Sequence, residues 1–297
     1  MTYQDIRRRL MAVADEREAK ALARILVEEL FGMSYADILC GGVESLASGD
    51  AQRLENAVCR LEKGEPLQYV LGYADFSGLR FKVAPGVLIP RPETEWLVSR
   101  AVQLFGDDNE SAADGRQADA DGSVLRLLDI GTGSGCIAIS LKHRLPAAYV
   151  EAWDISPSAL DIAASNAKAL LADVVFRRRD ALSAASSSAP SESHRWDAIV
   201  SNPPYVCLSE QKDMDANVLC HEPSSALFVP DADPLLFYRA IADYALLALK
   251  PEGRLLFECN TRYVAATADL LRGLGFEDVS QSDDCFGLPR FVEGKRS

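Results

Sequence analysis

The sequence predicts an α/β fold in which a helical bundle precedes a parallel-sheet domain and a β-hairpin links the two. About the first 70 residues repeat apolar side chains at helical spacing, and the stretch that follows is punctuated by glycine and proline. From about residue 125 onward, short apolar runs alternate with helical patterns, which is typical of a parallel sheet covered by helices. We therefore expect an N-terminal helical domain at 1–74, a hairpin linker at 75–92 and an α/β domain at 93–297.

The N-terminal region shows apolar residues at steps of three and four. This spacing predicts amphipathic helices whose apolar faces pack together. The residues that carry the pattern are Ile6, Leu10 and Val13, followed by Leu22, Ile25, Leu26 and Leu30. Such a bundle carries no chemistry of its own, so it is either a surface that grips a partner or a structural cap.

The linker region alternates apolar positions with the turn residues Gly78, Pro85 and Gly86, as a β-hairpin does. Arg91 and Glu93 lie where this linker ends, at the expected domain junction. There they are placed to contact a ligand or an incoming substrate. The proline between them also makes this segment a good helix start.

A glycine-rich turn follows the apolar run at 127–130. Glycines let the backbone approach a ligand closely, and the helix after the turn offers free N–H groups. The dinucleotide spacing G-x-G-x-x-G requires a third glycine where this chain has Cys136, which argues against a nicotinamide cofactor. The acid before the turn suits a ligand with an amino group and a sulfonium, such as S-adenosylmethionine, although glycine turns also occur for packing alone. The expected contacts are Asp129, Gly131, Thr132, Gly133 and Gly135.

Acidic residues end the next two predicted strands. Asp154 follows an apolar run and precedes Ser156-Pro157, a good helix start, and Asp180 follows the run at 174–178. We expect the Asp154 carboxylate to accept both hydroxyls of a ribose, and Asp180 to accept an adenine amino group. Each acid alone is equally a solvated loop residue, but in open α/β sheets ligands bind at this strand edge.

The tetrapeptide Asn202-Pro203-Pro204-Tyr205 follows the apolar run at 197–201. Proline restricts its own φ and the residue before it, so Asn202 and Pro203 should be extended. The Asn202 side-chain oxygen and the Pro203 carbonyl can then accept both hydrogens of one NH2 group, with the Tyr205 ring stacked on its plane. We predict that Asn202, Pro203 and Tyr205 are catalytic, that Pro204 also contacts substrate, and that Asn202 borders the cofactor. An ordinary turn at the end of a strand has the same sequence.

At these motifs the chain resembles the N5-glutamine methyltransferases of peptide chain release factors, of the PrmC/HemK type. The resemblance covers nearly the whole length and includes Gly-Glu-Pro-Leu-Gln-Tyr at 64–69, Ile-Pro-Arg-Pro-Glu-Thr-Glu at 89–95 and Asp-Ile-Ser-Pro at 154–157. The segment at 89–95 separates this family from other methyltransferases that carry Asn-Pro-Pro-Tyr. The chain departs from the family at Ser224-Ser225, where Arg and two glycines are frequent, and at Asn260, where glycine is frequent.

The resemblance implies a class I S-adenosylmethionine-dependent methyltransferase domain of Rossmann-like fold. It implies methyl transfer from S-adenosylmethionine to the side-chain amide N5 of the glutamine in the Gly-Gly-Gln motif of class I release factors, which supports translation termination. In the family the N-terminal domain helps to grip the release factor.

Composition agrees with a protein substrate. A formal net charge of −13 disfavours direct nucleic-acid binding, because that affinity comes largely from Lys and Arg. A nucleic-acid adenine methyltransferase should show a basic face, and an oxidoreductase should show the missing glycine spacing. A non-catalytic scaffold should have lost Asn202 or Asp154, and this chain keeps both.

Further features suggest a cytoplasmic protein without metal, and we expect it to act as a monomer. The 7 cysteines form no Cys-x-x-Cys pair, and the 3 histidines are not spaced with cysteines as zinc ligands. No apolar run approaches the roughly 18 residues of a membrane span, and the N-terminus mixes Arg with Asp and Glu.

The remaining sequence predicts the end of the α/β domain and two loops. The segments at 107–122 and 183–193, rich in small and polar residues, should be mobile and dispensable for catalysis. The further elements are helices at 234–249 and 262–273, a buried strand at 253–258, and an antiparallel terminal hairpin at 276–279 with 290–292.

Overall fold

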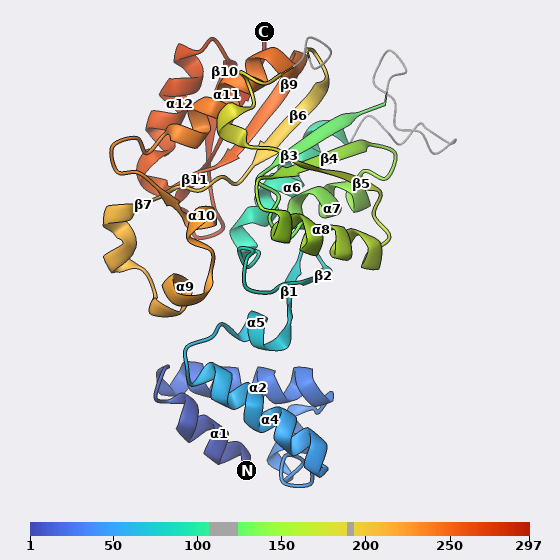
Figure 1. The fold of residues 1–297 in the computed structure, drawn as a ribbon, viewed down its shortest axis with the longest axis vertical. Helices are drawn as coiled ribbons and strands as arrows, with labels where there is room; N and C mark the ends of the chain where they lie inside the picture. Colours follow the sequence, from blue (N-terminus) through green and yellow to red (C-terminus); the bar gives the residue numbers. More distant parts are fainter. Residues whose placement is uncertain (107–123, 189–192) are drawn as a thin grey trace. The chain divides into compact units, whose positions relative to one another are not determined.

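The computed structural model describes residues 1–106, 124–188 and 193–297. It divides the chain into two compact units (Figure 1). The N-terminal unit comprises Met1–Tyr73, Val83–Pro85 and Met214–Glu222, and the α/β unit comprises Ala74–Lys82, Gly86–Asp213 and Pro223–Ser297. The sequence-based boundaries differ from this division, because most of the hairpin linker groups with the α/β unit and a later segment joins the N-terminal unit.

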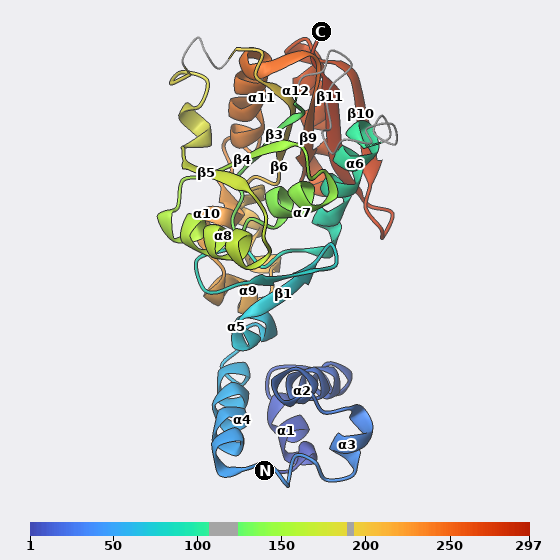
Figure 2. The ribbon, with the colours of Figure 1, turned by 90° about the vertical axis from the view of Figure 1, so that its right-hand side faces the viewer.

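Helices build the N-terminal unit (Figure 2). Polar caps begin several of them. Thr2 and Ser34 each form a capping box, Asp15 accepts the N–H of Glu18, and Gly32 in the left-handed region ends the second helix. The helices are α1 (Tyr3–Leu10), α2 (Glu16–Phe31), α3 (Tyr35–Leu39), α4 (Ser48–Leu61), α5 (Leu67–Leu71) and, from the later segment, α9 (Ala216–His221).

The core of the N-terminal unit confirms the helical bundle. Ile6, Leu10 and Leu26 are completely buried, as their spacing predicted. Val13 was wrongly assigned to this face: α1 ends at Leu10, so Val13 lies beyond the helical pattern and its side chain is 45% exposed.

A β-hairpin lies at the start of the α/β unit, formed by β1 (Tyr73–Phe76) and β2 (Leu79–Lys82). Ser77 and Gly78 both have positive φ, 49° and 76°, as a two-residue hairpin turn with right-handed strand twist requires. Asn166 holds the hairpin to the domain: it accepts the N–H of Lys82 at 2.8 Å and donates to the carbonyls of Lys82 and Ser134.

Seven strands form the main sheet of the α/β unit, in the order β10-β11-β9-β6-β3-β4-β5. The pairs from β9 to β5 are parallel, and β11 runs antiparallel to both of its neighbours. The strands are β3 (Arg126–Ile130), β4 (Tyr149–Asp154), β5 (Val174–Arg178), β6 (Trp196–Ser201), β9 (Leu249–Glu258), β10 (Glu277–Asp283) and β11 (Pro289–Lys295). The predicted Rossmann-like fold and terminal antiparallel hairpin are confirmed.

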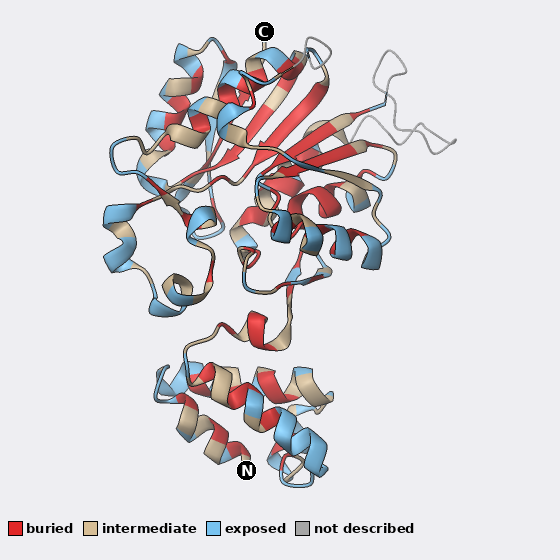
Figure 3. Ribbon diagram, in the orientation of Figure 1, coloured by how far each residue is buried: buried red, intermediate tan, exposed pale blue. Residues whose placement is uncertain are grey.

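Helices cover both faces of this sheet (Figures 1 and 2). Leu127 packs in a core with α6 (Glu95–Phe105), α7 (Cys136–Arg144) and α8 (Pro157–Ala169). Leu128, on the opposite face, packs with α11 (Leu236–Ala248) and α12 (Val264–Gly273). Figure 3 shows β3, β4 and β6 buried over most of their length, which explains why their sequences are nearly continuous apolar runs.

Short elements complete the unit. A small parallel pair joins β7 (Val206–Cys207) to β8 (Phe228–Val229). The others are α10 (Ser224–Leu227) and the 3-10 turns η1 (Pro92–Thr94), η3 (Ala181–Ser183), η5 (Leu208–Asp213) and η6 (Thr261–Tyr263).

The first expected mobile loop and part of the second lie outside the described residues. This holds for 107–122 and for 189–192. The described residues 183–188 form a hydrogen-bonded turn instead of an irregular segment, because Ser188 Oγ donates to the Ala184 carbonyl at 2.7 Å.

Candidate active site

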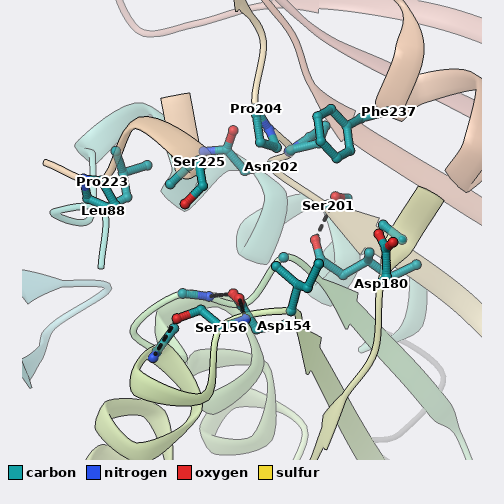
Figure 4. A pocket seen from close by; sticks show the side chains of 18 of the residues that line it. Leu88, Asp154, Ser156, Asp180, Ser201, Asn202, Pro204, Pro223, Ser225 and Phe237 are labelled. Carbon is teal, nitrogen blue, oxygen red and sulfur yellow. Dashed lines mark hydrogen bonds between the residues drawn. The ribbon is translucent and has the colours of Figure 1, made fainter. Parts of the chain in front are cut away.

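A cavity of about 360 Å³ lies in the α/β unit at the carboxyl ends of β3, β4 and β6 (Figure 4). Parallel strands end together there: Ile130 is in register with Trp153 on one side and with Ser201 on the other. Residues that follow these strands are therefore brought to one edge, as expected for an open α/β sheet. The cavity is lined by both predicted strand-end acids, by part of the glycine turn and by most of the Asn-Pro-Pro-Tyr segment.

The first two glycines of the glycine turn face the cavity, whereas the third is packed between helices. Gly131 and Gly133 line the cavity with φ of 79° and 55°, and a Cβ on Gly133 would meet nothing within 4 Å. Gly135 does not line it: a Cβ there would lie 2.9 Å from Ile139 Cδ1 and 3.1 Å from Ala163 Cβ. Gly135 therefore allows α7 and α8 to pack closely.

Asp154 and Asp180 both line the cavity and are both oriented by backbone N–H groups. The Asp154 carboxylate accepts from Gly133 N and from Ser156 N, each at 2.9 Å. Asp180 Oδ1 accepts from Leu182 N at 2.9 Å. The side chains are thus held in place before any ligand arrives, with acceptor capacity left on each carboxylate.

Apolar side chains also line the cavity near the two acids. Ile155 and Leu182 line the cavity and are 54% and 44% exposed. Together with the two carboxylates they suit a nucleoside, whose ribose and amino groups are polar and whose base is flat and apolar on its faces. The residues present therefore fit the adenosine part of S-adenosylmethionine.

Asp129 lies beneath the glycine turn and does not line the cavity, contrary to the direct contact expected from its position. Its Oδ2 accepts from Thr132 Oγ1 at 2.6 Å and from Ala138 N at 3.2 Å. Complete burial raises its pKa to about 7. Thr132 is likewise buried and absent from the lining, so both residues support the turn from below.

Asn202, Pro203 and Pro204 line the opposite side of the cavity. Asn202 Nδ2 donates to Thr94 Oγ1 at 3.2 Å, and that hydroxyl donates to Glu258 Oε2 at 2.7 Å. Among the described residues, no hydrogen-bond donor reaches Asn202 Oδ1. This oxygen is the kind of acceptor that the tetrapeptide was predicted to provide.

Tyr205 is oriented differently from the stacking position that was expected. It is absent from the cavity lining, and its hydroxyl donates to Glu258 Oε1 at 3.3 Å. Burial, followed by the charge of Glu258, raises the pKa of Tyr205. Phe237 from α11 lines the cavity and lies beside Pro204 in Figure 4, so it supplies an aromatic side chain there.

Arg91 and Glu93 are not brought into the cavity lining, which instead includes Leu88 from the same segment. Both lie near enough to the buried pair to affect it. Burial has the largest effect on the pKa of Tyr205, followed by the charges of Glu258 and Arg290, and the positive charge of Arg91 lowers it by a smaller amount. The negative charge of Glu93 makes the smallest contribution to the raised pKa of Glu258. The charges of Arg91 and Glu93 therefore act on the Tyr205–Glu258 pair.

The residue-by-residue prediction missed Thr94, Glu258 and Phe237. Glu258 could have been found by the pattern that identified Asp154, because it too is an acid at the end of a central strand. Thr94 lies inside the segment at 89–95 that carried the family resemblance. For Phe237 no local pattern distinguishes a cavity-lining ring from a core ring.

Two other properties concern the described part of the chain only. Within it, no group of three or more His, Cys, Asp or Glu side chains is arranged to hold a metal ion. No helix in residues 1–106, 124–188 and 193–297 has both the length and the apolar character needed to span a bilayer.

Two family models match the sequence: the PrmC N-terminal domain at residues 3–72 and the Methyltransferase small domain at residues 118–228. A solved structure with a similar fold is the T. thermophilus 16S rRNA N2 G1207 methyltransferase (RsmC) in complex with AdoMet and guanosine. Its TM-score is 0.51 at 16% identity, covering 76% of this chain and 50% of that one, so the likeness concerns the fold alone.

Curated relatives are much closer in sequence. A release factor glutamine methyltransferase from Bacteroides thetaiotaomicron is 45% identical over 291 residues, which cover 98% of each chain. One from Flavobacterium psychrophilum is 35% identical over 288 residues, 96% of this chain and 94% of that one. The resemblance inferred from the motifs is confirmed, and the chain belongs to the release factor glutamine methyltransferase family.

Proposed function

We propose that this protein transfers a methyl group from S-adenosylmethionine to the side-chain amide N5 of the glutamine in the Gly-Gly-Gln motif of class I peptide chain release factors. The reaction would support translation termination. The observation that carries the proposal is the position of Asn202 at the cavity, with an amide oxygen that no described donor reaches. Full-length identity of 45% to a release factor glutamine methyltransferase supports the same substrate.

The cofactor would occupy the side of the cavity formed by the glycine turn. Asp154 would accept the ribose hydroxyls, Asp180 the adenine amino group, and Ile155 with Leu182 would cover the base. Asn202 would border the cofactor on the substrate side. Because Gly131 and Gly133 have no side chains, the cofactor could approach their backbone closely. When bound, the cofactor supplies an electrophilic methyl group on a sulfonium sulfur, open to direct SN2 attack without a covalent enzyme intermediate.

Asp129, Thr132 and Gly135 would act on the cofactor indirectly. They hold the glycine turn through the Thr132–Asp129 hydrogen bond of 2.6 Å and through the close packing of Gly135 against Ala163. We therefore propose that these three residues keep the glycine turn in the conformation that binds the cofactor.

The substrate nitrogen would be held by two acceptors, Asn202 Oδ1 and the Pro203 carbonyl. An amide nitrogen is a weak nucleophile because its lone pair is delocalised into the carbonyl. Positive charge develops on the nitrogen during transfer, so both hydrogen bonds strengthen most in the transition state. No strong base is needed, because the methylated amide can lose its proton afterwards.

Other residues would shape the substrate entrance. Pro204 and Phe237 would contact the methylene groups of the glutamine side chain. Tyr205, whose hydroxyl is held by Glu258, would contact the substrate loop with its ring. We assign Arg91 and Glu93 to contacts with the release factor outside the cavity, because they do not line it and their charges act on the Tyr205–Glu258 pair.

Partner recognition would use the N-terminal region. The match to the PrmC N-terminal domain at residues 3–72 supports a role for residues 1–74 in gripping the release factor. We further propose a monomer that acts in the cytoplasm, where release factors work, without binding nucleic acid directly. The net charge of −13 agrees with a protein partner.

The test is mass spectrometry of a class I release factor incubated with this protein and S-adenosylmethionine. A gain of one methyl on the Gly-Gly-Gln glutamine is expected, with no gain on a release factor whose motif glutamine is replaced. Cofactor binding without methylation of the release factor would reject this substrate and favour another protein or a nucleic acid.

A further inference from the structure

Four side chains from three separate segments of the α/β unit form one hydrogen-bonded chain beside the cavity. Asn202 donates to Thr94, Thr94 donates to Glu258, and Tyr205 donates to the other oxygen of Glu258. We propose that Glu258 and Thr94 are positioning residues that determine which end of the Asn202 side-chain amide faces the substrate. This inference rests on the proposed function of Asn202.

Glu258 can serve as a fixed acceptor because of its place in the sheet. It ends β9, is 1% exposed, and has one hydroxyl on each carboxylate oxygen. Burial raises its pKa above the ordinary glutamate value, and the hydrogen bond from Thr94 and the nearby charge of Arg290 offset this only in part. An ionised carboxylate accepts hydrogen bonds and donates none.

The Thr94 hydroxyl has a single hydrogen, and Glu258 uses it at 2.7 Å. Toward Asn202, Thr94 can therefore only accept. This requires the NH2 end of the Asn202 amide to face Thr94, as the 3.2 Å contact shows, and turns the oxygen end away from it. The direction of one buried hydrogen bond thus sets the direction of the next.

The consequence for chemistry is large because the two ends of an amide have opposite polarity. An oxygen facing the cavity accepts a hydrogen from a substrate NH2 group, whereas an NH2 end would meet that group donor to donor. Without the acceptor at Thr94, the Asn202 amide loses the contact that distinguishes its two orientations. A fraction of molecules would then present the wrong end.

The sheet brings these residues together although they are far apart in the sequence. Strands β6 and β9 are parallel neighbours with Ser201 in register with Phe257, so Asn202 and Glu258 follow at the same edge. Thr94 reaches them from the 3-10 turn before α6. Because Tyr205 binds the same carboxylate, Glu258 anchors both ends of the Asn202–Tyr205 segment.

The first test compares Thr94→Val with Thr94→Ser in release factor methylation. Valine keeps the shape of threonine without its hydroxyl, so we expect kcat to fall about tenfold with the KM for S-adenosylmethionine within about twofold. Serine keeps the hydroxyl and should recover most of the turnover. Thr267→Val, a completely buried threonine on α12 outside the cavity lining, is the matched control and should stay within about twofold of wild type.

The second test asks whether Thr94 acts through Asn202. In an Asn202→Ala background, Thr94→Val should cause no further loss of kcat, because the group that it orients is gone. A full additional tenfold loss would show that Thr94 acts by another route and would overturn the inference.

The third test does not depend on methylation. The side-chain NH2 signals of Asn202 in a ¹H–¹⁵N spectrum, assigned by their loss in Asn202→Ala, should shift and exchange faster with water in Thr94→Val and in Glu258→Gln. Unchanged signals would overturn the inference. If wild-type protein fails to methylate any release factor, the proposed function fails, but the Asn202 signals still decide whether Thr94 and Glu258 orient this amide.

Discussion

At the residue scale, the cavity depends on which acceptor atoms face it and on what holds them there. Asp154 is oriented by the N–H groups of Gly133 and Ser156, and Asn202 by the hydroxyl of Thr94. Each acceptor is thus fixed before ligand binds, which reduces the reorganisation needed in the transition state. The same principle explains why the supporting residues matter although they do not line the cavity.

Asn202→Ala removes the acceptor on which the proposed chemistry depends. We expect turnover to fall by about 10² or more, by analogy with loss of one preorganised transition-state hydrogen bond. Steady-state methylation of a release factor measures it, with cofactor binding recorded on the same sample to show that the site is intact. Near-normal turnover would rule out this mechanism.

Asp154→Ala removes the proposed ribose acceptor and also releases the N–H groups of Gly133 and Ser156. We expect S-adenosylmethionine to bind about tenfold to a hundredfold more weakly, measured by calorimetry. Asp161→Ala, an exposed acid on the neighbouring helix α8, serves as the control and should bind normally. Equal affinities for the two variants would contradict the ribose assignment.

Asp129 predicts a pH dependence of stability. Burial raises its folded-state pKa from 3.8 to about 7, so between these values the folded protein keeps a proton that the unfolded chain has released. The contribution of Asp129 to the free energy of unfolding should therefore be greatest at low pH and decrease by up to about 1.4 kcal/mol per pH unit until about pH 7.

Urea unfolding of wild type and Asp129→Asn, at steps of about one pH unit, isolates this contribution because other groups cancel in the difference. The free energy of unfolding of wild type minus that of Asp129→Asn should fall as pH rises toward about 7 and then level off. A difference independent of pH would show that the Asp129 carboxylate titrates normally.

At the scale of elements, the glycine turn joins β3 to α7 and must satisfy two demands. Its first part faces the cavity, and its last residue lies between α7 and α8. All three glycines have positive φ, which costs other residues about 1–2 kcal/mol. Only Gly135 also lacks space for a side chain.

Substitutions in this turn should therefore differ in effect. Gly135→Ala adds overpacking against Ile139 and Ala163 to the backbone strain, and we expect it to lower the free energy of unfolding by about 2–4 kcal/mol. Gly133→Ala, with open space around its Cβ, should lose only about 1–2 kcal/mol. Urea unfolding without cofactor compares them, and equal losses would mean that helix packing does not constrain Gly135.

At the scale of the whole molecule, each unit has its own hydrophobic core and the surface charge is strongly acidic. The N-terminal unit packs around residues such as Ile6 and Leu26, and the α/β unit buries both faces of its sheet. The formal net charge of −13 acts on any charged partner regardless of the fold.

This charge predicts weak binding to nucleic acid. Non-specific DNA-binding proteins reach a Kd of about 10⁻⁴ to 10⁻⁶ M at physiological salt through Lys and Arg contacts, and we expect this protein to bind duplex DNA more weakly than that range. Fluorescence anisotropy with a labelled duplex measures it, with a basic protein as positive control. Micromolar binding that falls steeply with added salt would contradict the expectation.

The sequence by itself determined the fold class and the main polar groups of the cavity lining. Helical spacing identified the N-terminal bundle, and alternating strands and helices identified the parallel sheet. Asp154, Asp180 and Asn202 could be placed together because each follows a strand, and parallel strands end at one edge. This reasoning needs only local pattern and the topology of the fold.

Only the tertiary structure decided which side chains reach the cavity and which support it. Thr94 and Glu258 are 164 residues apart, so no local pattern shows that one hydroxyl connects them to Asn202. Asp129 was expected to contact ligand, yet its strand position turns it beneath the glycine turn. Side-chain direction at a strand end depends on register and on the helix packed above it, and long-range packing sets both.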